Sequence, residues 1–297
     1  MEFNSFLQHM TNGISLGSLY ALIAIGYTMV YGILKLINFA HGDIFMMATY
    51  FAFYGIAAFA LPWYLSFIVA IVLTTLLGLL VEKSSYKPLR NAPKISIMIS
   101  AIGVSFFLEN LATVIFGGRP KKFPEPAFFT DVIHIGSVSL QRLTLIIPVV
   151  TLIFLFFLLY LINKTKNGMA MRAVSKDYET ASIMGIDVNK TISFTFGLVS
   201  ILAAVGAIMW GMKFPQIQPL MGVMPGLKCF IAAVIGGVGN ITGAVIGGFI
   251  LGIGEIMLVA FLPSLSGYKD AFAFILLILI LLFKPTGIMG ENISEKV

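Results

Sequence analysis

The stretch LTLIIPVVTLIFLFFLLYLIN, residues 143–163, decides the class of this protein because it contains no charged side chain. The hydrocarbon core of a bilayer is about 30 Å thick, and a helix needs about 20 apolar residues to cross it. Comparable apolar runs lie at 12–34, 43–61, 63–82, 95–116, 191–213, 226–238 with 241–262, and 268–284. Membrane barrels instead show short alternating strands. The sequence therefore predicts an all-α, polytopic transmembrane helix bundle with about eight to ten spans.

The composition supports a single transmembrane domain over residues 1–297. Hydrophobic residues make up 59% of the chain, charged residues make up 11%, and the mean hydropathy is +0.99. Soluble domains carry about 25% charged residues, so this chain has too few charges to cover a water-soluble surface. Residues 1–11 contain no Lys or Arg. They lack the basic start of a cleaved signal peptide, and we expect the first span to remain as an anchor.

The positive charges indicate how the chain crosses the membrane. The formal net charge is +6, and loops 82–94 and 164–190 are rich in Lys and Arg. Because two spans separate these loops, both are expected on the cytoplasmic side. Loop 117–142 must then be extracytoplasmic, although it also carries basic residues, and the N-terminus, which has no Lys or Arg, is placed outside. Loop charge of this kind indicates membrane topology rather than a nucleic-acid-binding face.

Two short polar and Gly-rich segments, 38–43 and 236–243, interrupt apolar runs in corresponding parts of the two halves. Transporters place discontinuous helices at their substrate pathways in this way. The alternative is a tight turn between two helices at each place, and the sequence leaves both open. The residues of these candidate breaks are Asn38, His41, Gly42, Asp43, Gly236, Gly237, Gly239, Asn240 and Gly243.

The extracytoplasmic loop 117–142 contains a candidate hairpin. Two short β-prone segments, 131–135 and 138–142, flank the pair Gly136-Ser137. A two-residue connection of this type is compatible with a type II′ turn. The hairpin could present a surface to a partner, or it could be a lid over helix ends.

Two carboxylates lie inside predicted spans, where an ionised group costs at least about 2.5 kcal/mol unless it faces the bundle, a partner or water. Glu109 shares a four-residue spacing with Ser105, and Glu255 follows Gly248 and Gly252 at helical spacing. Both could lie on a substrate path. Hydrogen bonding of Glu109 to a neighbouring helix and close packing around Glu255 are the favoured structural alternatives.

The sequence lacks the residues that a disulfide, a metal site, a catalytic site or a nucleotide-binding loop would need. Cys229 is the single cysteine, so no disulfide can form within the chain, and His41 with Asp43 has no further ligands nearby for a metal. No G-x-S-x-G, H-E-x-x-H or paired catalytic carboxylates are present, and there is no G-x-x-x-x-G-K-[ST]. We expect no catalysis, no cofactor and no metal in this chain, and any nucleotide energy must come from another polypeptide.

The segment 168–190 is the most informative polar stretch. Ala170, Val174, Tyr178 and Ala181 share one helical face, and Gly185 is a stop signal. The sequence predicts a short amphipathic helix. Such a helix either lies along the membrane surface or docks into a groove on another protein.

This segment also carries a resemblance. Glu179-Thr180-Ala181 followed by Gly185 resembles the E-A-A-x-x-x-G signature of ABC-importer permeases, with Thr in place of the second residue. Leu36–Asp43, Arg172-Ala-Val, the 236–243 run and Lys284-Pro-Thr-Gly287 look like branched-chain amino-acid ABC permeases across nearly the whole chain. Within that family the sequence is more similar to the LivH-type subunit than to its longer LivM-type partner.

The resemblance implies a subunit in the bacterial inner membrane that moves leucine, isoleucine or valine. Its implied partners are a LivM-type permease, two ATP-binding subunits that hold the ATP, and an extracytoplasmic substrate-binding protein. The segment 168–190 would contact the ATPase through Arg172, Glu179, Ala181 and Gly185 and pass its motion to spans 143–163 and 191–213. A urea or short-amide ABC importer remains an alternative, as do an ion-coupled secondary transporter that uses Glu109 and Glu255 and a passive channel.

Overall fold

The computed structural model describes residues 3–90, 92–135 and 138–290. Within them, seven helical segments are long and apolar enough to cross a membrane, which confirms the predicted fold class. Five are single helices, one joins α3 to a π-helical turn, and one joins a short 3-10 helix, Pro263–Tyr268, to α12. The helices are α1 (Phe3–Leu34), α3 (Trp63–Val81, extended to Tyr86 by a π-helical turn), α4 (Lys94–Phe116), α6 (Arg142–Lys164), α9 (Val188–Lys213), α11 (Ile241–Phe261) and α12 (Lys269–Phe283).

Two apolar helices are shorter than a full span: α2 (His41–Ala57) and α10 (Val223–Gly236). Both are largely buried inside the bundle. Their length explains why a count of apolar runs gives more crossings than there are full-length helices. Helix α2 begins within the first predicted break, 38–43, and α10 ends at the start of the second, 236–243.

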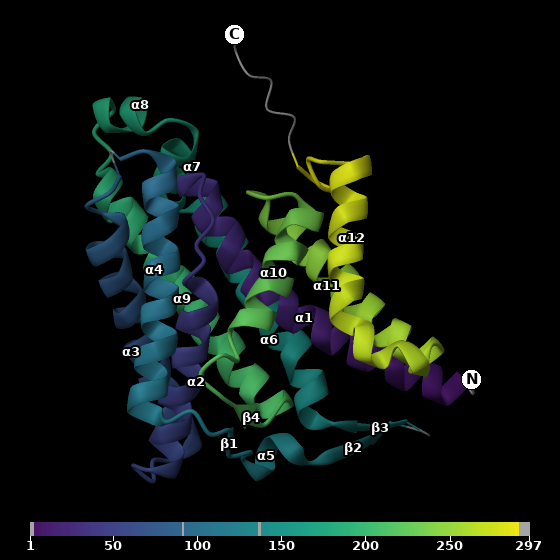
Figure 1. The fold of residues 1–297 in the computed structure, drawn as a ribbon. Coiled ribbons are helices and arrows are strands. Elements are labelled where there is room, and N and C mark those ends of the chain that lie inside the picture. Colours follow the sequence, from purple (N-terminus) through teal and green to yellow (C-terminus); the bar gives the residue numbers. More distant parts are fainter. Residues whose placement is uncertain (1–2, 91, 136–137, 291–297) are drawn as a thin grey trace.

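The two ends of the bundle differ in character (Figure 1). Helices α7 (Lys166–Lys176) and α8 (Tyr178–Ile183) lie at one end, together with the loop between α3 and α4. Arg90 of that loop donates a hydrogen bond to Asn189 at the start of α9, which confirms that loops 82–94 and 164–190 share a side. The strands lie at the opposite end.

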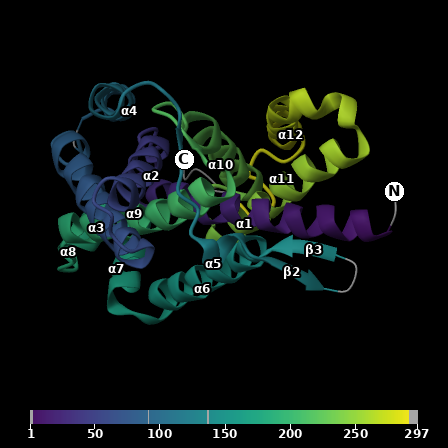
Figure 2. The same ribbon diagram turned by 90° about the horizontal axis from the view of Figure 1, so that it is seen from below.

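Small residues let the central helices approach closely. Helix α1 runs diagonally through the molecule and packs along α11 (Figures 1 and 2). A Cβ on Gly248 would lie 2.7 Å from the Cα of Ala21, and one on Gly252 would overlap the backbone of Gly17. Glycine at these positions therefore sets the distance between α1 and α11, as the close-packing interpretation of Gly248 and Gly252 predicted.

Polar side chains define where the helices begin. Asp187 caps α9 by accepting a hydrogen bond from Lys190 N at 3.0 Å, and Asn240 caps α11 by accepting one from Gly243 N at 2.9 Å. Asp177 caps α8 through the backbone of Glu179. Hydrogen bonds from the Thr180 hydroxyl and backbone to Asp177, and from Lys190 N to Asp187, hold the pKa of both carboxyls below the usual range. These caps weaken only as the pH falls through those lowered values.

The structure corrects the single amphipathic helix that the sequence predicted for 168–185. Asp177 adopts an extended conformation, with φ −157° and ψ 118°, and it divides the segment into α7 and α8. The buried residues of α7 are Gly168, Met171 and Val174, so the inward face is turned relative to the predicted one. Tyr178 is the first residue of the next helix, α8, so it does not continue the face of α7.

The hairpin in loop 117–142 has the predicted strands. β2 (Val132–Ile135) pairs antiparallel with β3 (Val138–Gln141), and Ile133 lies opposite Leu140. The predicted turn at Gly136-Ser137 lies outside the described residues. A short helix, α5 (Ala127–Thr130), precedes the hairpin, and a second ladder joins β1 (Lys121–Lys122) to β4 (Gln216–Ile217).

Candidate translocation and coupling sites

The two short helices, α2 and α10, begin against each other. A Cβ on Gly42 would lie 2.7 Å from the carbonyl oxygen of Gly222 and 3.5 Å from the Cα of Gly226. Glycine at 42 and 222 is therefore required for this contact. Helix N-termini carry free N–H groups and partial positive charge. The N-termini of α2 and α10 therefore place free N–H groups and partial positive charge inside an apolar bundle, where the two helices meet.

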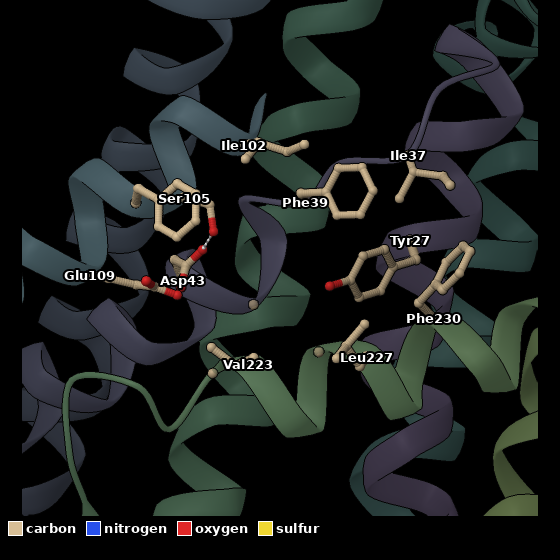
Figure 3. Close-up of a pocket in the computed structure, with 14 residues that line it drawn as sticks. Tyr27, Ile37, Phe39, Asp43, Ile102, Ser105, Glu109, Val223, Leu227 and Phe230 are labelled. Carbon is tan, nitrogen blue, oxygen red and sulfur yellow. Dashed lines mark hydrogen bonds between the residues drawn. The ribbon is translucent and has the colours of Figure 1, made fainter. Parts of the chain in front are cut away.

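A cavity of about 230 Å³ opens beside this junction (Figure 3). Its walls come from α1, the 35–40 connection, α2, α4 and the start of α10. The residues that line it are Tyr27, Ile37, Phe39, Gly42, Asp43, Ile102, Ser105, Phe106, Glu109, Gly222, Val223, Gly226, Leu227 and Phe230. In Figure 2, seen from below the bundle, α10 lies between α4 and α12. Because α4 and α10 both line the cavity, the cavity lies on the face of the bundle that carries these helices. Most of its wall is apolar, and the polar groups gather at one end.

The polar end of the cavity contains two of the predicted carboxylates. Asp43 lies in the first turn of α2, where the helix dipole favours a negative charge, and its Oδ2 accepts a hydrogen bond from the Ser105 hydroxyl. Glu109 lies one turn beyond Ser105 on α4, beside Asp43 (Figure 3). The sequence stripe Ser105 and Glu109 therefore faces the cavity, while Thr113 farther along α4 is exposed.

The other residues of the first break are buried next to this cavity. Asn38 is 2% exposed and accepts a hydrogen bond from the Tyr86 hydroxyl at 2.7 Å. The His41 ring packs edge-on against Tyr27, with ring centroids 4.6 Å apart. The predicted set 38–43 is thus brought together at the beginning of α2.

The second break, 236–243, has a different structure. It forms a tight turn between α10 and α11, in which Gly237 and Gly239 adopt φ +109° and +96°. The C-terminal segment closes this turn, because Met289 N donates to Gly236 O and Asn240 Nδ2 donates to Met289 O. Gly236 and Gly243 pack against each other at the base of the turn. The structural partner of the first break is the 218–222 connection before α10, which the apolar pattern does not mark.

The α7–α8 segment exposes an unusual patch at its end of the bundle. Ile183 and Met184 are 84% and 78% exposed, and Arg172 and Glu179 are also exposed. Ala181 faces inward, 3% exposed. Gly185 has φ +85° and open space around it, so its backbone requires glycine or a residue that tolerates the left-handed region. Exposed apolar side chains outside the spans are typical of a protein-binding surface.

Two tyrosine hydroxyls connect this end to the first break. Tyr178 of α8 donates a hydrogen bond to Ile33 O, one of the last carbonyls of α1. Just after it, Lys35 leaves the helix with φ +53°, a conformation that costs a non-Gly residue about 1 kcal/mol or more. Tyr86 holds Asn38 on the other side of this bend. The end of α1 and the start of α2 are therefore tied to elements that surround the exposed patch.

Glu255 has a structural partner that the sequence interpretation missed. Its two oxygens accept hydrogen bonds at 2.8 Å, one from Lys228 Nζ and one from the Tyr20 hydroxyl. Lys228 also forms a 2.6 Å ion pair with Asp270 of α12. Lys228 is a lone basic residue in the apolar 226–238 run, and a cation and an anion within neighbouring spans are a signal for such a pair.

The junction of α2 and α10 leads to a first prediction. Gly222→Ala places a methyl group into the backbone of Gly42, so α10 must move and the cavity must change shape. We expect transport to fall about tenfold or more, as for a misplacement of about 1 Å in a binding site. Gly267→Ala is the control because no atom lies within 4 Å of its Cβ position. Equal transport by the two variants, at equal protein levels in the membrane, would contradict the role of this junction.

Known proteins share both the sequence and the fold. The family described as "Branched-chain amino acid transport system / permease component" matches residues 9–281. The chain is 42% identical to the high-affinity branched-chain amino acid transport system permease protein LivH of Escherichia coli K12 and 40% identical to BraD of Pseudomonas aeruginosa. Each alignment covers 100% of this chain and 99% of the relative. A solved structure of PsaBC from Streptococcus pneumoniae has a similar fold, with a TM-score of 0.51 at 13% identity over 96% of this chain and 94% of that chain.

Proposed function

Because this chain belongs to the family of permease components of branched-chain amino acid transport systems, we propose that it is the LivH-type subunit of an importer for leucine, isoleucine and valine. It is a multi-pass protein of the cell inner membrane. The full-length match to relatives that are described as high-affinity branched-chain transport permeases supports this substrate class. The apolar wall of the α2–α10 cavity suits an aliphatic side chain, and Asp43 with Glu109 suits its ammonium group.

The energy for transport comes from separate ATP-binding subunits in this proposal. The exposed patch of Glu179, Ile183 and Met184 is the observation that carries it, because these side chains lie outside the spans at the basic, cytoplasmic end. Arg172, Ala181 and Gly185 complete the docking segment. ATP is bound by the partners and not by this chain, whose own role is conduction without catalysis.

The docking segment is placed to move the spans. Helix α7 follows α6 after a single residue, and Gly168 packs on the backbone of Ile162. At the other side, α8 leads through Asp187 into α9. Closure of the ATPases would therefore act on α6 and α9, as the sequence predicts, and also on the α1–α2 bend through Tyr178.

A second permease of the LivM type and an extracytoplasmic binding protein complete the proposed assembly. The second permease would cover the face where α4 and α12 flank α10, since the α2–α10 cavity lies on that side (Figure 2). The binding protein would deliver substrate at the end that holds β1 to β4. Of the two carboxylates that an ion-coupled carrier would use, Glu255 is paired with Lys228, whereas Glu109 lines the α2–α10 cavity.

Substitution at Gly185 tests the docking assignment. Gly185→Trp puts a large ring on the exposed patch, and we expect uptake to fall about tenfold or more while the protein remains in the membrane at its normal level, as for the loss of an interface anchor. Gly185→Asn is the matched control, because Asn tolerates the positive φ and adds little bulk. The readouts are leucine uptake and substrate-stimulated ATP hydrolysis of the assembled transporter. Full uptake by the Trp variant would remove the basis for the assignment.

A further inference from the structure

A second cavity, of about 480 Å³, lies between α1, α9, α10, α11 and α12 in the half of the bundle away from α7 and α8. It is separate from the α2–α10 cavity and shares no lining residue with it. Its lining includes residues from the start of α1, the end of α9 and the start of α12. Its volume falls within the range of about 300–1,000 Å³ that is typical of small-molecule sites.

One side of this cavity is charged. Lys228 and Glu255 are 5% and 4% exposed, and both reach the cavity wall. Asp270 and Lys269 from the start of α12 complete the charged lining. Two positive and two negative side chains therefore lie on one side of the cavity, and His9, Tyr20 and Ser266 are the other polar residues of its lining. A ligand with no net charge can enter without changing this balance, whereas a net charge would carry a large cost of desolvation.

The ion pairs leave hydrogen-bonding capacity toward the cavity. Lys228 Nζ has three donor protons, and its acceptors among the described residues are Glu255 Oε1 and Asp270 Oδ1. Both oxygens of Glu255 are occupied, by Lys228 and Tyr20. Asp270 differs, because its side chain is 43% exposed and it belongs to α12, which is mostly exposed along its length. Asp270 is therefore the partner that can exchange.

The other side of the cavity is apolar. The Trp210 ring packs on Phe214 with centroids 4.7 Å apart, and Leu16 and Ile256 lie nearby on the wall. An aliphatic side chain of four carbons fits such a surface without any polar requirement. The cavity thus places a charge-balanced group of ions directly beside a wall of apolar side chains.

We propose that this cavity is a second binding site for the zwitterion of an aliphatic α-amino acid, on the extracytoplasmic side of the chain. The carboxylate of the ligand accepts a hydrogen bond from Lys228, the ammonium donates to Asp270, and the side chain lies against Trp210. The ligand exchanges for the direct contact between Lys228 and Asp270. This inference rests on the proposed function for its substrate class.

Cysteine protection tests the site in membrane vesicles that contain the full chain and its native partner subunits. Ser266 lines the cavity and is exposed, so Ser266→Cys should react with a membrane-impermeant maleimide. Cys229 is 0% exposed, and the unsubstituted chain should remain unlabelled. Leucine at about ten times its dissociation constant should slow labelling of Ser266→Cys about tenfold, because about one site in eleven is then free. Leu262→Cys, at the same end but outside the cavity, should react at an unchanged rate.

Analogues and a second substitution test which groups of the ligand the cavity recognises. Isocaproate lacks the ammonium and isoamylamine lacks the carboxylate, so neither should protect Ser266→Cys. Adding Asp270→Asn should raise the half-protecting leucine concentration about tenfold or more, since it removes a charged acceptor. Asp131→Asn, on the hairpin outside the cavity, should have no effect.

Three results would overturn the inference: unchanged labelling of Ser266→Cys up to the solubility limit of leucine, equal slowing of Leu262→Cys, or equal protection by isocaproate. If Asp270→Asn exposes Cys229 to labelling, that variant is misfolded and the analogues decide. Leucine uptake is measured in the same vesicles. Uptake without protection would reject this site and leave the proposed function intact, whereas protection without uptake would reject the transport assignment.

Discussion

Gly252→Leu should remove most of the folded protein from the membrane. The new side chain would enter the backbone of Gly17, and α1 and α11 would have to separate along their whole contact. Overpacking against side chains typically costs about 1–3 kcal/mol, and a collision with backbone lies at the upper end of that range or beyond it. Thermal unfolding of the purified chain in detergent, and its level in the membrane, measure the effect.

Gly103→Leu is the matched control for this substitution. Gly103 is also a helical glycine, in α4, but no atom lies within 4 Å of its Cβ position. The control should retain the melting temperature and the membrane level of the unsubstituted chain. If both variants are equally stable, close packing between α1 and α11 does not determine the stability of the bundle.

Tyr178→Phe should reduce leucine uptake about fivefold to tenfold while the transporter still assembles and hydrolyses ATP. The substitution removes only the hydroxyl that donates to Ile33 O, so the α8 patch keeps its shape. A hydrogen bond of this kind contributes about 0.5–1.5 kcal/mol, and coupling between sites is of the order of 1–3 kcal/mol. The measurement is the ratio of leucine transported to ATP hydrolysed in reconstituted vesicles.

Tyr160→Phe serves as the control for the tyrosine. Tyr160 lies on α6 with 65% of its surface exposed, and its hydroxyl has no hydrogen-bond partner among the described residues. Its transport ratio should be unchanged. An unchanged ratio for Tyr178→Phe as well would show that the α1–α2 bend is not driven through this hydroxyl.

The spans, and the shared side of loops 82–94 and 164–190, could be predicted because both depend on local composition. An apolar run such as 143–163 is stable only as a helix in the bilayer, and the basic loops 82–94 and 164–190 favour the cytoplasmic side. The Glu179 to Gly185 spacing likewise lies within a single short segment. These features require no knowledge of which helices become neighbours.

The contacts between distant segments could not be predicted in the same way. Lys228 as a lone cation in an apolar run indicates that it has an acidic partner, but only the packing of α10, α11 and α12 shows that the partners are Glu255 and Asp270. The same holds for Gly42 and Gly222, because the need for glycine at these positions is evident only from the contact between the starts of α2 and α10. Asp177 separates α7 from α8 as the N-cap of α8. Assigning residues to the faces of one continuous helix does not detect this cap.

The short ladder between β1 and β4 joins three helices at the outer end of the bundle. Phe123 N donates to Pro215 O at 3.0 Å, and Lys121 Nζ donates to the Tyr54 hydroxyl near the end of α2 at 2.6 Å. The strand β1 follows α4, and β4 precedes α10. Because these contacts link α2, α4 and α10 at the end away from α7 and α8, we expect these helix ends to move together, with a single exponential time course rather than one rate for each helix.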